Sequence, residues 1–233
     1  MAYIDTIDIE DAEGIVKQEY EKGFRRSGRV FNILKIMSRS PSALKEAMRM
    51  YLAIMYGKSE LSRAQREMLA TVVSSINHCY YWIEAHGDDF RDEVQNEELA
   101  NHLKYDWKTT DLSQEDKALC TWAEKLTLIP GEMDESDVHN LEKVGFSQNA
   151  ISDAAQVIGY FNYINRIADG LGVDLEPEME KWNTFYFFFF QYQNAGIPKR
   201  VSPNPINDCS GDLKNVFTII AEENMMKKAG TYG

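Results

Sequence analysis

The feature that most constrains the fold is a succession of segments that begin with a helix N-cap and end at a helix stop. Ser62 and Gln65 have the spacing of a capping box, and an apolar periodic run follows them. A short apolar helix is also expected over residues 30–39. Further caps stand at Ser40, Ser113, Asp134 and Ser147, and stops at Gly57, Pro130, Gly145 and Gly170 to Gly172. Strand-like alternation is almost absent, so the sequence predicts an all-α fold.

The charge balance argues against two classes of partner. The chain has 233 residues, with 37 acidic against 25 basic side chains and a net charge of −12. Such a surface repels phosphate backbones and anionic membranes, so we expect neither nucleic-acid nor membrane binding. The hydrophobic content of 44% suits one globular domain with a sizeable core, or a domain with an extension.

The N-terminus and the cysteines indicate a cytoplasmic protein. The opening "MAYIDTIDIE" lacks the basic start and apolar run of a secretory signal. The apolar aromatic run Phe185 to Phe190 is far shorter than the roughly 20 residues that span a bilayer. Cys79, Cys120 and Cys209 are odd in number and widely spaced, so we expect reduced thiols.

The composition changes after about residue 179. The segment "KWNTFYFFFFQYQ" is dense in aromatic side chains, and a stretch rich in Pro, Asn, Ser and Gly follows it. We therefore expect a helical domain over residues 1–179 and an aromatic-rich C-terminal extension over 180–233. An exposed run of this kind favours aggregation, so the extension is expected to pack either on the core or on a second subunit.

One stretch carries the candidate chemistry: Glu67 upstream of "HCYYWIEAH", which contains Cys79, Trp82 and His86. In one continuous helix Glu67 would lie about 18 Å along the axis from Cys79. The intervening "SSINH" can end one helix and cap the next, so we expect a reversal that brings Glu67 back beside the second helix. Cys79 would then lie in the first turn of that helix, where the dipole lowers the pKa of a thiol.

Two interpretations of this stretch are open on spacing alone. Cys79, Trp82 and His86 share one helix face, and Glu67 with His86 could form a carboxylate–imidazole relay that moves a proton near neutral pH. The structural alternative is a capped helical hairpin in which Glu67 pairs with Arg66 or water, and the histidine and cysteine only pack.

The order of these residues resembles a family signature. Glu67, eleven residues, Cys79, two residues, Trp82, three residues and His86 resemble the Glu, Cys, Cys, His motif of the AhpD-like superfamily, which includes carboxymuconolactone decarboxylases. The flanking "LSRAQRE" and the later "FNYINRIADGLGV" resemble its peroxidase-related subgroup. The resemblance covers roughly residues 5 to 179.

The resemblance implies an all-helical AhpD-like domain that assembles as a homo-oligomer, dimeric or trimer-based, with the site near a subunit contact. In redox members of the family the cysteine nearer the histidine reacts with peroxide, and here that position is Trp82. A local dithiol cannot form. The retained Glu67 and His86 fit the decarboxylase-type relatives better, with Trp82 as a flat apolar wall beside an unsaturated small molecule.

The leading hypothesis is therefore an acid/base enzyme that acts on a small organic acid or lactone through Glu67 and His86, with Cys79 assisting or lining the pocket. A one-cysteine peroxidase that uses Cys79 is the first alternative. A binding or assembly protein without catalysis is the second. A metal site formed by Glu67, His78, Cys79 and His86 matches no standard zinc spacing, and we expect neither metal nor cofactor.

Three further residues are candidates for binding the substrate. Tyr80 and Tyr81 flank Cys79, and one of them should point inward. Arg166 lies in a polar stripe that we interpret first as a packing network, although its guanidinium could reach a substrate carboxylate. The stripe consists of Asn162, Asn165, Arg166 and Asp169. His102 and His139 are expected on the surface.

Overall fold

The computed structural model describes residues 2–179, and within that range every regular element is a helix. The α-helices are α1 (Gly14–Ser27), α2 (Asn32–Ile36), α3 (Pro41–Tyr56), α4 (Arg63–Ile76), α5 (Tyr80–Val94), α6 (Glu97–Tyr105), α7 (Gln114–Leu128), α8 (Glu135–Lys143) and α9 (Gln148–Leu171). Two short 3-10 helices are η1 (Trp107–Thr109) and η2 (Pro130–Glu132). The all-α prediction is confirmed, whereas the predicted extension over 180–233 lies outside the described residues.

Local side-chain chemistry starts most of these helices. Ser62 Oγ accepts the Gln65 N–H and Gln65 Oε1 accepts the Ser62 N–H, both at 3.1 Å, which completes the predicted capping box. The expected caps Ser113, Asp134 and Ser147 are also present. The helix expected over 30–39 is wrong in length: α2 has five residues, and a turn over 37–39 leads to Ser40, which Pro41 holds outside the helical region.

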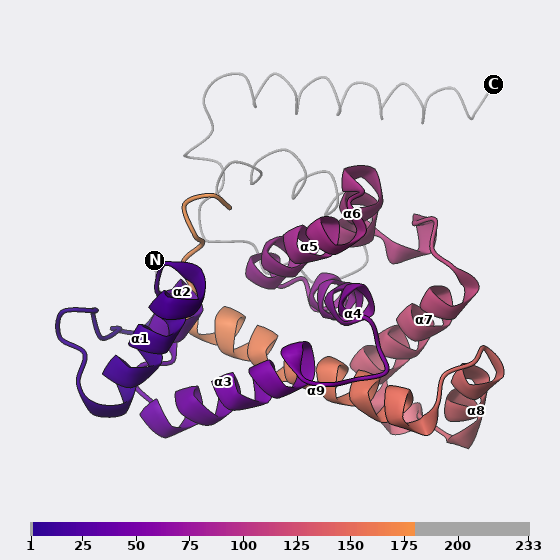
Figure 1. Ribbon diagram of the computed structural model, residues 1–233, viewed down its shortest axis with the longest axis horizontal. Helices are drawn as coiled ribbons and strands as arrows, with labels where there is room; N and C mark the ends of the chain where they lie inside the picture. Colours follow the sequence, from indigo (N-terminus) through magenta and orange to yellow (C-terminus); the bar gives the residue numbers. More distant parts are fainter. Residues whose placement is uncertain (1, 180–233) are drawn as a thin grey trace, which may run out of the picture. The chain divides into compact units, whose positions relative to one another are not determined.

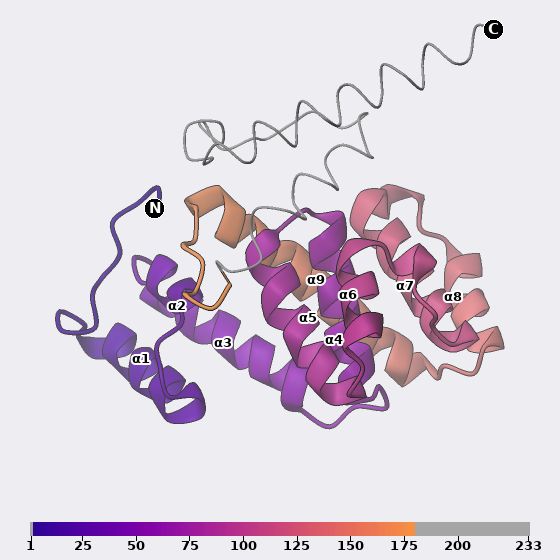
Figure 2. The same ribbon diagram turned by 90° about the horizontal axis from the view of Figure 1, so that it is seen from above.

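Helix α4 lies in the middle of the helical domain. Figures 1 and 2 show it between α5 on one side and α9 on another, and it also packs against α6 and α7. Helices α1 and α2 lie at one end of the domain and α7 and α8 at the other (Figures 1 and 2). Within residues 2–179, no helix combines the length and the apolar character that crossing a membrane requires.

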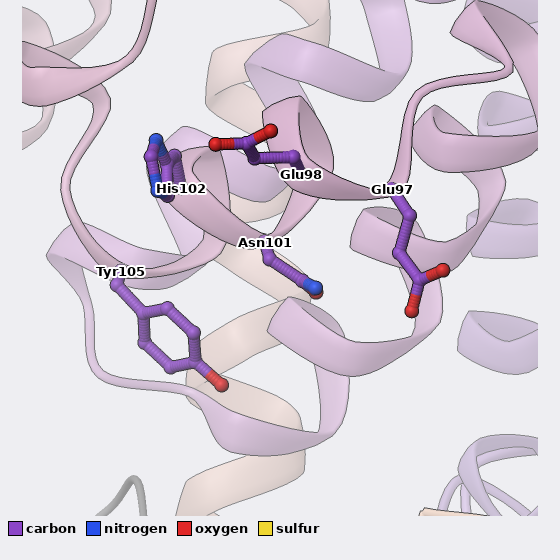
Figure 3. Close-up of a pocket in the computed structure, with 5 residues that line it drawn as sticks. All are labelled: Glu97, Glu98, Asn101, His102 and Tyr105. Atoms are coloured by element: carbon purple, nitrogen blue, oxygen red, sulfur yellow. The ribbon is translucent and has the colours of Figure 1, made fainter.

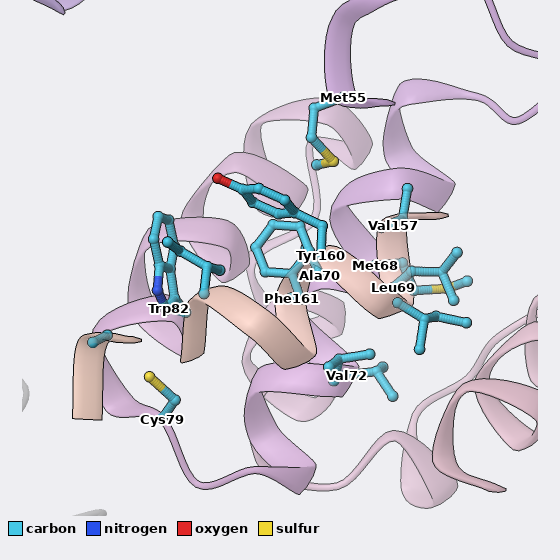
Figure 4. Packing of buried hydrophobic residues seen from close by; sticks show 14 of the residues in the cluster. Met55, Met68, Leu69, Ala70, Val72, Cys79, Trp82, Val157, Tyr160 and Phe161 are labelled. Carbon is cyan, nitrogen blue, oxygen red and sulfur yellow. The ribbon is translucent and has the colours of Figure 1, made fainter. Parts of the chain in front are cut away.

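The core forms around α4 because nearly every side of that helix is covered. All residues of the stretch 66–74 are buried, including Glu67. Figure 4 shows Leu69 and Val72 of α4 packed near Val157 and Phe161 of α9. Each such side chain stabilises the fold by about 1.5–3 kcal/mol when it leaves water. A charged residue in this stretch is therefore an exception that needs a partner.

Candidate functional site

A tight turn between α4 and α5 places the two candidate proton-transfer residues side by side. His78 adopts a left-handed φ of 57°, and the Cys79 N–H donates to Ser74 O at 2.9 Å, so the chain reverses within a few residues. The predicted reversal is confirmed. Cys79 is the N-cap of α5 and not a residue of its first turn, and its side chain makes no capping hydrogen bond.

Glu67 and His86 are in direct contact. Glu67 Oε2 lies 2.5 Å from His86 Nδ1, and the two side chains are 0% and 2% exposed. The other carboxylate oxygen forms an ion pair with Arg63, one turn earlier on α4. The Arg63 guanidinium also stacks on the Tyr56 ring, 3.8 Å from its centroid. The interpretation in which Glu67 pairs with Arg66 is wrong, because Arg66 donates to the backbone carbonyls of Ser62, Ile54 and Gly57.

Aromatic rings enclose the imidazole of His86. The Trp82 indole stacks on it, and the Phe161 ring meets it edge-on with centroids 4.6 Å apart. The ring centroid of Tyr51, on α3, lies 6.2 Å from that of the imidazole. Two buried nitrogens on these rings, His86 Nε2 and Trp82 Nε1, have no hydrogen-bond partner among residues 2–179. An unpaired buried polar atom is costly, so both nitrogens are candidates for contact with a bound small molecule.

The surroundings of Cys79 oppose an activated thiol. Its Sγ is buried and donates to Asn165 O at 3.9 Å. Burial, the largest cause, and the nearby Asp169 both raise the pKa of the Cys79 thiol. The predicted lowering of this pKa by the helix dipole is wrong, because desolvation of the thiolate outweighs the dipole.

The other predicted binding residues, Tyr80, Tyr81 and Arg166, form hydrogen bonds outside the Glu67–His86 pair. The Tyr81 hydroxyl donates to Glu176 Oε1 at 2.9 Å and is the inward member of the pair, whereas the partly exposed Tyr80 hydroxyl donates to Met179 O at 3.3 Å. Arg166 is exposed, and its guanidinium donates to Asn162. The contacts of these three side chains do not include Glu67 or His86.

The polar stripe of α9 forms the expected packing network. Asn165 Nδ2 donates to Ser74 Oγ at 3.1 Å, and Asn77 Nδ2 donates to both Asn162 and Asn165 at 3.1 Å. The network joins α9 to the turn between α4 and α5. It therefore holds that turn, and with it the register of Glu67 against His86.

Four residues that contact the pair were missed from the sequence. Arg63 and Asp89 stand four residues before Glu67 and three after His86, so helical spacing could have identified both. Tyr51 and Phe161 come from α3 and α9, which are remote in sequence from the motif. No local pattern indicated either.

A different trio replaces the metal-ligand set considered from the sequence. Ligand-type atoms of Glu67, His86 and Asp89 lie within 4.8 Å of one another. His78 is exposed and is not part of this group. Because the Arg63 guanidinium already supplies a positive charge to Glu67, a further cation would be repelled at short range. We interpret the trio as a set of groups that exchange protons.

Two surface hollows of the described chain lie away from the Glu67–His86 pair. Figure 3 shows one of about 520 Å³ along α6, lined by Glu97, Glu98, Asn101, His102 and Tyr105. Another, of about 360 Å³, is lined by Lys58, Ser59, Glu60, Asn149, Ser152 and Asp153. Neither contains a predicted site residue. His102 and His139 are exposed, as predicted.

The fold and the site define an all-helical AhpD-like protein that retains the Glu/His pair and lacks the second cysteine. Residues 41–103 match the carboxymuconolactone decarboxylase family model, and this range contains the whole motif. A structure of an uncharacterized peroxidase-related protein from Silicibacter sp. TM1040 is 30% identical, with a TM-score of 0.69, over 76% of this chain and 93% of that one. The chain therefore belongs to the AhpD/carboxymuconolactone decarboxylase superfamily, in its peroxidase-related subgroup.

Two further comparisons agree. A peroxidase-related protein with an alkylhydroperoxidase AhpD core, from Ralstonia eutropha JMP134, has a TM-score of 0.72 at 21% identity, over 76% of this chain and 94% of that one. At that identity the likeness concerns the fold alone. The uncharacterized protein YdfG of Bacillus subtilis (strain 168) is 28% identical over 116 residues, which are 49% of this chain and 78% of that protein.

Proposed function

We propose that this protein is an acid/base enzyme that acts on a small organic acid or lactone, by decarboxylation, lyase or isomerase chemistry. One observation carries the proposal: His86 has its Nδ1 in contact with Glu67 Oε2 at 2.5 Å, while its Nε2 is buried and has no partner within the described part of the chain. A histidine general base requires a carboxylate bonded to one ring nitrogen, while the second ring nitrogen stays available to take a proton.

In this mechanism Glu67 accepts the Nδ1–H and so fixes the lone pair on Nε2. His86 Nε2 takes a proton from the substrate, and the carboxylate stabilises the imidazolium that forms. Arg63 holds the second carboxylate oxygen and thereby orients Glu67. The reverse transfer returns the proton to the substrate carbon or to a leaving group.

The rings around His86 suit a flat, unsaturated substrate. Trp82 and Phe161 exclude water, which strengthens charge interactions inside the site. Trp82 Nε1 is a buried donor that finds no partner in the residues that the structure describes, and it could hold a substrate oxygen. Because His86 is almost fully buried, the surrounding side chains must shift for a substrate to reach Nε2.

The one-cysteine peroxidase gains no support from the surroundings of Cys79. Burial raises the pKa of that thiol and so removes the thiolate that would attack a hydroperoxide. We therefore place Cys79 in the wall of the site.

The test is turnover of a panel of small unsaturated acids and lactones, followed by mass spectrometry and by release of CO2. Glu67→Gln and His86→Asn are each expected to lower turnover by about 10²- to 10⁴-fold. Cys79→Ala serves as the matched control on the same hairpin and should stay within about threefold of the wild type. Hydroperoxide consumption that disappears only in Cys79→Ala would overturn the proposal, as would full activity in both relay variants.

A further inference from the structure

Asp89 links the buried pair to the protein surface. It follows His86 by one turn of α5, and its Oδ2 lies 3.8 Å from His86 Nδ1. Its side chain is 48% exposed, whereas those of Glu67 and His86 are 0% and 2% exposed. The separation exceeds a hydrogen bond but is within ion-pair range, so a small rotation or one bridging water would join the two groups.

The other groups around His86 are poor proton carriers. Trp82 and Phe161 offer ring faces and edges only. Burial raises the pKa of Tyr51 well above its ordinary value, so this phenol keeps its proton. Arg63 is partly exposed and faces Glu67, but a guanidinium does not release a proton near neutral pH.

We propose that Asp89 is the proton-transfer residue that connects the Glu67–His86 pair with solvent, an inference that rests on the proposed acid/base function. A proton that enters the ring at Nε2 makes an imidazolium. Its Nδ1 proton, which Glu67 otherwise accepts, then passes to the Asp89 carboxylate and leaves a neutral ring with its proton on Nε2. The carboxylic acid then gives that proton to water. Running in reverse, the same path recharges His86.

The electrostatics of Asp89 suit this role. Burial, the largest cause, and the neighbouring carboxylates of Glu67 and Asp92 raise the pKa of Asp89, whereas His86 and Arg63 lower it. The net upward shift brings the carboxyl closer to the range of an imidazole. A raised pKa makes it easier for the Asp89 carboxylate to accept a proton.

The experiment measures proton exchange at His86 without any substrate. Protein labelled with ¹⁵N-histidine is studied by NMR, and His86 is assigned from the His86→Asn spectrum. Asp89→Asn keeps the shape of the side chain but cannot carry a proton, so exchange of the imidazole N–H with water should slow by at least about tenfold. Asp89→Glu should restore most of the rate.

Asp92→Asn is the matched control, because Asp92 stands one turn further along α5 and is bonded to Arg91. It should slow exchange at His86 by less than about twofold, because it removes only one of the charges that raise the pKa of Asp89. Wild-type exchange in Asp89→Asn, or equal slowing in both variants, would overturn the inference and leave the proposed function standing. Conversely, a failure to find turnover in the substrate panel would not affect the exchange result.

Discussion

The indole of Trp82 lies stacked on the imidazole of His86, with ring centroids 5.2 Å apart and an interplanar angle of 21°. Trp82→Ala is expected to lower the free energy of unfolding by about 3–5 kcal/mol, because it removes a large buried ring. It should also change the NMR signals of His86. Trp122 of α7 is buried to a similar degree, so Trp122→Ala should destabilise the fold and leave the His86 signals in place. Equal changes at His86 in both variants would argue against a specific stacking role.

Cys79 should behave as an inert thiol. Burial raises its pKa, so alkylation near pH 7 is expected to be slow in the native protein and fast after unfolding. Intact mass after a stoichiometric dose of hydroperoxide should show no sulfenic acid at this residue. Cys120, which is also buried with a raised pKa, provides the internal comparison. Rapid oxidation confined to Cys79 would favour the one-cysteine peroxidase over the acid/base enzyme.

Asn165 should contribute to stability through its amide. Asn165→Leu leaves Ser74 and Asn77 without hydrogen bonds that they make to this side chain, and we expect a loss of about 1–3 kcal/mol in urea unfolding. Asn149→Leu, at the exposed start of the same helix, should cost less than about 0.5 kcal/mol. Similar small losses in the two variants would contradict the packing network.

The buried ion pair between Lys104 and Glu84 gives a pH-dependent prediction. Their side chains are 3% and 5% exposed, and Lys104 Nζ lies 3.1 Å from Glu84 Oε2. Lys104→Met leaves the nearly buried Glu84 carboxylate without this partner. We therefore expect the free energy of unfolding to fall by about 3–5 kcal/mol near pH 7. Lys108→Met, in an exposed pair with Glu124, should lose at most about 1 kcal/mol.

Burial raises the pKa of Glu84 even in the wild type, so the folded protein holds that proton more tightly than the unfolded chain does. Its contribution to stability is therefore complete below the ordinary glutamate pKa and is lost as the pH rises through the folded value. Removing Lys104 raises this pKa further. The loss in Lys104→Met should thus shrink between about pH 7 and about pH 4.5 in urea unfolding. A loss that does not change with pH would exclude Glu84 as its cause.

The sequence was most informative where cause and effect lie within one helical turn. The Ser62 capping box and the Ser147 cap were predicted because donor and acceptor are three residues apart. Helix α1 was not anticipated; its N-cap, Glu13, makes no side-chain capping bond. For the site, one short reversal relates Glu67 to His86, so it could be predicted. The predicted lowering of the Cys79 pKa was wrong, because the local sequence indicates the helix dipole but not how deeply the thiol is buried.

Trp82, in place of a second cysteine, also determines which redox chemistry this motif can carry out. An indole does not take part in thiol exchange, and within residues 2–179 both cysteines, Cys79 and Cys120, are free thiols. Positions 79 and 82 therefore cannot form a disulfide with each other under reducing or oxidising conditions. Under the proposed acid/base function, such a site would need no reductase to reset it.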